Sequence, residues 1–129
     1  MRILLDTHVF LWALVDDPRL TVQARDLLLM PQTELVVSTA SIWEISIKYG
    51  LRRGDMPVDG ESALSFARQA GYSVLPIIPE HAAAVDRLPG IHADPFDRML
   101  VAQALHEPMR LMTHDAQLAR YAESLVILF

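Results

Sequence analysis

Four carboxylates lie where the chain could support metal-dependent hydrolysis. Asp6 follows an apolar run that is expected to form the first strand, and Asp115 follows the fourth expected strand. Asp97 lies in the first turn of an expected helix, with Asp94 three residues earlier on the same side. Glu44 lies on the helix after the second strand. Because ligands of a parallel α/β sheet bind at the carboxyl ends of its strands, we expect these acids to meet at one edge.

Several carboxylates at one edge would repel each other, since like charges a few ångströms apart cannot all stay ionised without compensation. A divalent cation is the usual compensation, and a ligand set of oxygens favours Mg²⁺ or Mn²⁺ over zinc. Such ions activate water and neutralise the charge of a phosphodiester under attack. The acids therefore predict a metal-dependent phosphodiesterase site.

Each aspartate also has a local structural interpretation. Asp6 and Asp115 are suited to cap the helices that follow them, and Asp97 suits a helix N-terminus. Asp94 precedes Pro95 and is a good N-cap, so capping is its favoured role. The functional interpretation depends on the acids jointly, because all of them fall at compatible ends of expected elements.

Glu44 has the most complete structural alternative. The run Ser41 to Glu44 fits a capping box, and Glu44 and Lys48 form a favourable i,i+4 pair. A glutamate among isoleucines and a tryptophan is nevertheless an unusual choice for a mostly apolar helix.

Strands and helices alternate along the chain. Strands are expected at residues 3–5, 34–38, 72–78, 110–113 and 125–129, and helices at 8–15, 21–30, 40–49, 61–70, 80–88, 94–105 and 117–123. This alternation predicts an α/β fold, in which a mostly parallel sheet of about five strands is covered by helices on both faces.

Composition narrows the function classes. The chain has 129 residues, which suits one domain, and 52% of them are hydrophobic. A net charge of −5 argues against a general electrostatic grip on nucleic acid, so an RNA substrate would need local basic residues or bound cations. The chain contains no cysteine, which excludes disulfides and thiolate chemistry. The apolar run near the N-terminus is too short to span a bilayer, so we expect a cytoplasmic protein without a membrane segment.

Four motifs give the chain a family resemblance. LLDTH, SIWEISIK, DPFDRMLVAQA and LMTHD, in this order, resemble the PIN-domain ribonucleases, and especially the VapC toxins of toxin–antitoxin pairs. The resemblance covers essentially the whole chain and implies a single PIN domain, residues 1–129, with a three-layer α/β/α sandwich. It implies an endoribonuclease that depends on Mg²⁺ or Mn²⁺ and cleaves RNA, with transfer RNA a frequent target. The metal acids carried over from the motifs are Asp6, Glu44, Asp97 and Asp115, with Asp94 accessory.

Further residues are expected around these acids. Thr7 and Thr113 match hydroxyl positions that orient the acids or a water molecule. Lys48, Arg52 and Arg53 form a basic group at the end of the Glu44 helix and are candidates for RNA contact, with a solvated helix end favoured by the helix dipole as the alternative. Arg98 is a fourth candidate, with an internal salt bridge as its alternative role.

The two histidines beside metal acids, His8 and His114, have a structural hydrogen-bonding role as their favoured interpretation, with substrate contact as the alternative. The histidine spacing shows no zinc pattern.

The resemblance also implies a cognate antitoxin that binds a groove formed with the early helices, and a homodimer. Two alternatives remain. A phosphoryl-transfer enzyme with an aspartate after the first strand is disfavoured, because His8 stands where the second aspartate of such phosphatases lies. A catalytically silent PIN-like interaction module is disfavoured by the presence of all four motif acids.

Overall fold

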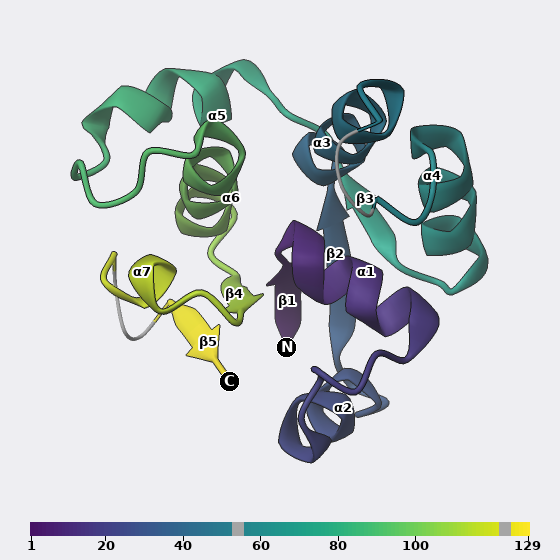
Figure 1. Ribbon diagram of the computed structural model, residues 1–129. Coiled ribbons are helices and arrows are strands. Elements are labelled where there is room, and N and C mark those ends of the chain that lie inside the picture. Colours follow the sequence, from purple (N-terminus) through teal and green to yellow (C-terminus); the bar gives the residue numbers. More distant parts are fainter. Residues whose placement is uncertain (53–55, 122–124) are drawn as a thin grey trace.

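The computed structural model describes residues 1–52, 56–121 and 125–129 and places five strands in one parallel sheet (Figure 1). The strands are β1 (Arg2–Leu5), β2 (Glu34–Ser38), β3 (Ser73–Leu75), β4 (Arg110–Thr113) and β5 (Val126–Leu128). Their order across the sheet is β3-β2-β1-β4-β5, and all four neighbouring pairs are parallel. The prediction of a mostly parallel sheet of about five strands is confirmed.

Helices connect the strands. They are α1 (Thr7–Val15), α2 (Val22–Leu28), α3 (Thr39–Gly50), α4 (Gly60–Gln69), α5 (Pro79–Ala84), the 3₁₀ turn η1 (Val85–Arg87), α6 (Pro95–His106) and α7 (Ala116–Ala119). In Figure 1, α1 lies beside α4 and across the sheet from α6.

The two faces of the sheet carry separate apolar cores, because successive side chains of a strand point to opposite faces. In β1, Ile3 and Leu5 belong to a core shared with α1, α2, α4 and part of α3. Leu4 belongs to the other core, with residues of α6 and α7. All three side chains are fully buried. A strand that is apolar on both faces is expected in a parallel sheet covered by helices, and the arrangement confirms the three-layer α/β/α fold.

Several expected elements are shorter than predicted, including α2, which ends at Leu28, and β5, which spans Val126–Leu128. The third strand ends at Leu75 rather than residue 78, because Pro76 has no N–H to give to a sheet. The helix expected at 80–88 becomes α5 and the 3₁₀ turn η1 ahead of Pro89. The helix expected at 117–123 ends at Ala119, and residues 122–124 lie outside the described part.

No helix in the described part of the chain is long and apolar enough to cross a membrane.

Candidate functional site

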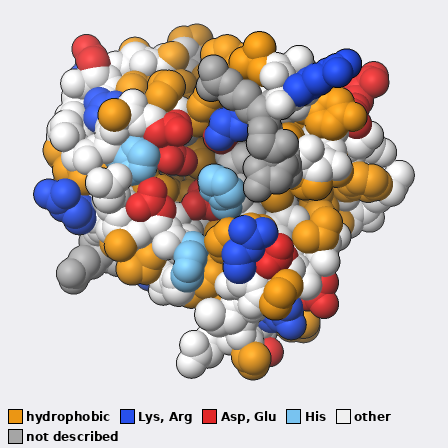
Figure 2. Space-filling view, viewed as in Figure 1, with side chains coloured by type: hydrophobic (Ala, Val, Ile, Leu, Met, Phe, Trp, Pro, Cys, Tyr) orange, Lys and Arg blue, Asp and Glu red, His pale blue; other side chains and the backbone are white. Residues whose placement is uncertain are grey.

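The predicted acids gather at the carboxyl edge of the sheet, around its central strands. Asp6 follows β1, and its backbone N–H donates to the Met112 carbonyl of β4 at 3.1 Å. Asp115 follows β4 by two residues, while Glu44 and Asp97 come from α3 and α6. Figure 2 shows acidic and histidine side chains gathered on one face of the molecule. The structure therefore places acids from four separate elements in one region.

Three of the aspartates each use one oxygen to cap a helix. The Oδ1 atoms of Asp6, Asp94 and Asp115 accept backbone N–H groups at the start of α1, α6 and α7, with the shortest bond to each at 2.8, 2.8 and 2.9 Å. The capping role favoured for Asp94 is confirmed, and Asp6 and Asp115 have it too. Capping fixes the side-chain rotamer, so the second oxygen of each carboxylate is held in a defined direction.

Two buried threonines orient the acids by hydrogen bonds to their carboxylate oxygens. Thr113 donates from Oγ1 to Asp6 Oδ2 at 2.5 Å and accepts the Asp115 backbone N–H at 3.0 Å. Thr7 Oγ1 donates to Glu44 Oε1 at 2.6 Å. Both hydroxyls are buried, so each holds its carboxylate without competition from water.

Glu44 is buried inside this network rather than placed in a capping box. The cap of α3 is Ser38, whose Oγ accepts the Ala40 N–H at 2.9 Å, so the capping-box interpretation is wrong. The i,i+4 pair is confirmed, with Lys48 Nζ 2.5 Å from Glu44 Oε2. Ser41, which the capping box would have used, instead lies 3.0 Å from the Thr7 hydroxyl.

The electrostatics of the acids indicate crowded negative charge. Burial, with the charges of Asp94, Asp6 and Glu44, raises the pKa of Asp97 to about 7, against a smaller opposing effect from His92. Burial also raises the pKa of Asp6, although the Thr113 hydrogen bond acts in the opposite direction. A bound cation would relieve this repulsion and lower both pKa values.

The basic residues expected to contact RNA differ in their contacts and exposure. Lys48 reaches the acids through its pair with Glu44. Arg52 lies on the exposed turn after α3, and Arg53 lies outside the described residues. Arg98 instead donates to backbone carbonyls of η1 and of the loop after it, at 2.9 Å from Val85 O and 3.1 Å from Pro89 O. Its contacts favour the internal role, with carbonyl oxygens as partners in place of the carboxylate expected for a salt bridge.

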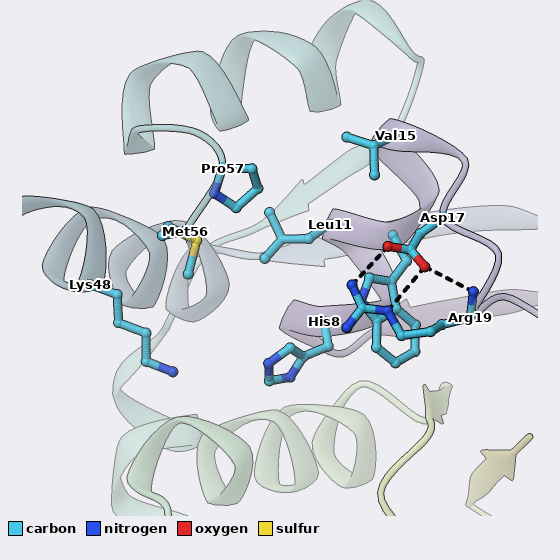
Figure 3. Close-up of a pocket in the computed structure, with 9 residues that line it drawn as sticks. His8, Leu11, Val15, Asp17, Arg19, Lys48, Met56 and Pro57 are labelled. Atoms are coloured by element: carbon cyan, nitrogen blue, oxygen red, sulfur yellow. Dashed lines mark hydrogen bonds and ion pairs between the residues drawn. The ribbon is translucent and has the colours of Figure 1, made fainter. Parts of the chain in front are cut away.

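A pocket opens beside the acids, between α1 and the end of α3. Figure 3 shows the Lys48 ammonium group and the His8 ring turned toward the same open space, with Leu11 and Met56 along its wall. His114 lies near this pocket, where its Nδ1 contacts the Phe129 carbonyl and its ring packs edge-on to Trp12. The hydrogen bond fits the structural role favoured for His114, whereas His8 is exposed.

His92 is the site residue that the motifs did not indicate. Its Nε2 lies 3.0 Å from Asp115 Oδ2 and 3.5 Å from Asp97 Oδ2. The sequence offered one signal for His92, its position two residues before the helix cap Asp94. At that spacing its Nδ1 accepts the Asp94 backbone N–H at 3.1 Å. Histidine spacing could not reveal it, since its partners are acids from other parts of the chain.

The donor set fits a hard divalent cation. Carboxylate oxygens of Asp97 and Asp115 lie within 4.8 Å of each other and of a ring nitrogen of His92, which the Asp94 N–H bond leaves as a hydrogen-bond donor rather than a ligand. Further carboxylate oxygens come from Asp6 and Glu44 in the same region. Oxygen-rich sets of this kind suit Mg²⁺ or Mn²⁺.

A second group, of His81, His106 and Glu107, fits a metal less well. The Nδ1 of His81 accepts the Ile78 N–H at 3.2 Å, so its Nε2 carries the proton that faces Glu107 at 2.8 Å. This group therefore links α5 to the end of α6.

Solved structures share this fold. The chain matches VapBC2 from Rickettsia felis, solved with a promoter DNA fragment, at a TM-score of 0.71 and 15% identity, covering 99% of this chain and 98% of that one. It matches VapBC-1 from nontypeable Haemophilus influenzae at 0.67 and 18% identity, with 99% and 98% covered. It matches FitAcB from Neisseria gonorrhoeae at 0.64 and 18% identity, with 97% and 96% covered.

Sequence comparison adds the family. No curated protein sequence matches the chain. The family profile described as PIN domain matches residues 3–124, a span that contains all the predicted acids, and the chain therefore belongs to the PIN domain family.

Proposed function

We propose that the protein is a VapC-like toxin, a metal-dependent endoribonuclease in which residues 1–129 form one PIN domain. The observation that carries the proposal is the convergence of acids from separate elements, with the pKa of Asp97 raised to about 7 by burial and by neighbouring carboxylates. Such mutual repulsion destabilises the folded chain unless a positive charge offsets it. A bound cation is the counter-charge that suits a set of oxygen ligands.

Asp6, Asp97 and Asp115 are the proposed principal ligands of Mg²⁺ or Mn²⁺, with Glu44 and Asp94 as further ligands or acting through water. When bound, such an ion supplies positive charge for a phosphodiester and activates water for its hydrolysis.

The chain's other residues would orient these acids and hold the substrate. The buried hydroxyls of Thr7 and Thr113 would hold Glu44 and Asp6 in place through their hydrogen bonds. Lys48 lines the adjoining pocket and would contact the RNA backbone, joined by Arg52 and Arg53 after α3. Structured RNA, including transfer RNA, is the proposed substrate class, and the cytoplasm is the proposed location.

A cognate antitoxin is the proposed regulator, and an apolar groove on the surface is its proposed binding site. An apolar groove between α1 and α4 is lined by Leu11, Val15, Pro57 and Phe66. Leu11, Val15 and Pro57 also line the pocket that contains Lys48 (Figure 3), so the groove leads toward the acids. An antitoxin segment with an apolar face and a basic end would bury the groove and pair with the acids.

A homodimer would cover a separate apolar surface. Trp43, Ile47 and Leu51 follow one another at i,i+4 spacing on and just after α3, and they are 57, 36 and 59% exposed. Trp43 also lines an apolar pocket between α3, α5 and α6, together with Phe96 of α6. Sedimentation analysis of the protein and of Trp43→Ser tests this assembly, with dissociation of the variant expected and a monomeric unsubstituted protein refuting it.

The experiment that tests the activity is cleavage of a mixed small-RNA pool by purified protein, with Mg²⁺ or Mn²⁺ against EDTA. Asp6→Asn is the informative variant, because asparagine caps a helix as well as aspartate does and so removes the charge while keeping the start of α1. Asp26→Asn, which changes an exposed acid on α2, is the matched control.

Metal-dependent cutting that Asp6→Asn abolishes and Asp26→Asn retains is the expected result. Cutting that survives both EDTA and Asp6→Asn would contradict the mechanism. Absence of cutting together with absence of metal binding would favour the silent interaction module.

A further inference from the structure

His92 lies between two of the proposed metal ligands without belonging to any family motif identified in the chain. Its side chain is largely buried, with 14% exposed. Its Nε2 is 3.0 Å from Asp115 Oδ2 and 3.5 Å from Asp97 Oδ2. A ring nitrogen so close to two carboxylates either binds the metal with them or donates a hydrogen bond to them.

The second ring nitrogen decides between these roles. Nδ1 of His92 accepts the backbone N–H of Asp94 at 3.1 Å, so it carries no proton. A neutral imidazole has its proton on the other nitrogen, and Nε2 is therefore a donor directed at Asp115. A protonated ring nitrogen has no lone pair for a metal, so this geometry disfavours direct ligation and favours a hydrogen bond to the ligand.

The loop that carries His92 is held in place independently of the acids. The His92 backbone N–H donates to the Tyr121 hydroxyl at 3.0 Å, and the His92 carbonyl accepts from Arg98 at 3.4 Å. Arg98 also donates to the carbonyls of Val85, in the 3₁₀ turn η1, and of Pro89, in the loop that follows it. The imidazole is thereby presented to the acids by α6 itself, from which Arg98 projects.

Asp115 has the greatest need for such support. Its side chain is 40% exposed, against 22% for Asp97, and its Oδ1 is engaged with the Gln117 N–H as a helix cap. The other oxygen, Oδ2, is the one that His92 contacts. At this exposed cap of a one-turn helix, the bond from Gln117 sets the direction of Oδ2, and the bond from His92 holds Oδ2 there.

We propose that His92 is a positioning residue for the metal site, and that its Nε2–H fixes the free oxygen of Asp115 toward Asp97. This inference rests on the metal-dependent activity proposed above. Hydrogen bonds from a second layer of residues to ligating carboxylates hold the ligands in their binding orientation, and their loss lowers metal affinity by about 10- to 100-fold.

The test measures binding of Mn²⁺ alone, by calorimetry, to the intact chain and four variants. His92→Ala removes the donor, whereas His92→Gln places an amide N–H near the position of Nε2. His106→Ala removes an exposed imidazole from the other end of α6 and serves as the matched control. Asp6→Asn tests the metal site itself.

We expect the Kd for Mn²⁺ to rise about 10- to 100-fold in His92→Ala. We expect it to recover most of the way in His92→Gln and to stay unchanged in His106→Ala. A merely structural role would lower the unfolding temperature of His92→Ala and leave the Kd of the folded protein unchanged, which overturns the inference. An equal loss in the alanine and glutamine variants overturns it as well, because the donor would then not be the cause.

The outcomes also separate this inference from the proposed function. If the unsubstituted chain binds Mn²⁺, Asp6→Asn does not, and His92→Ala binds normally, only the role of His92 is refuted. If the unsubstituted chain binds no Mn²⁺, the proposed metal site and the role of His92 are refuted together.

Discussion

Replacing Asp97 by asparagine should stabilise the metal-free protein at neutral pH and abolish the proposed metal-dependent activity. The carboxyl of Asp97 is mostly buried among other acids, and its pKa is raised to about 7 from an ordinary value of 3.8. The folded chain therefore holds the proton more tightly than the unfolded chain. Asparagine preserves the shape of the side chain and removes the charge that the fold disfavours.

The direction with pH follows from proton linkage. Below the unfolded pKa of 3.8 both states carry the proton, so ionisation of Asp97 costs the fold nothing. As pH rises toward about 7 the unfolded state ionises first, and the stability of the folded state falls until both are ionised. At ~1.4 kcal/mol per pKa unit, the interval corresponds to an upper limit of roughly 4 kcal/mol. Loss of a charge from the first turn of α6 opposes the gain by about 0.3–1 kcal/mol.

Urea unfolding in EDTA, followed by circular dichroism, measures the effect at about pH 4 and about pH 8. We expect Asp97→Asn to exceed the unsubstituted protein by roughly 2–4 kcal/mol at the higher pH and to differ little at the lower. Asp26→Asn, at an exposed position on α2, controls for the change in net charge. Adding Mn²⁺ should stabilise the unsubstituted protein and leave Asp97→Asn unaffected. A variant no more stable than the unsubstituted protein at about pH 8 would refute the reasoning.

Three further substitutions probe the packing and hydrogen bonds behind the site, each measured by urea unfolding. Thr113→Val should cost about 1–3 kcal/mol and weaken Mn²⁺ binding, because Asp6 loses its buried donor, whereas Thr113→Ser should behave nearly as the unsubstituted protein. Gly60→Ala should cost about 1–3 kcal/mol, since its Cβ would lie 1.7 Å from Ser46 Oγ, and Ser46→Ala should recover part of that loss. Gln103→Leu should cost about 1–3 kcal/mol, because it leaves buried polar side chains on neighbouring elements without their partner.

The type and order of the elements could be predicted because hydrophobic period reports local structure directly. The ends of elements were harder, and proline accounts for two of the errors. Pro76 cannot donate to a neighbouring strand, which ends β3 at Leu75. Pro89 disfavours helical backbone at Leu88, which is extended, so the helical segment ends at Arg87. The order of strands across the sheet could not be predicted, because periodicity carries no information about which strands are neighbours.

The gathering of the acids was predictable for a topological reason, since residues at the carboxyl ends of parallel strands share one edge. The contacts between them were not. His92 joins Asp115 across 23 residues of sequence, and Arg98 faces carbonyl groups that no sequence pattern marks as acceptors. Such contacts depend on how a loop without regular structure is folded, and hydrophobic period says nothing about loops.

The capping bonds explain how the chain tolerates these acids before any cation arrives. Asp6, Asp94 and Asp115 each accept backbone N–H groups at a helix N-terminus, where the partial positive charge of the helix stabilises a carboxylate. Asp97 accepts no such capping bond among the described contacts, and burial together with the neighbouring carboxylates raises its pKa to about 7. The helix N-termini that position these carboxylates thus also offset their repulsion, and the remaining charge imbalance at Asp97 would favour the proposed cation binding at neutral pH.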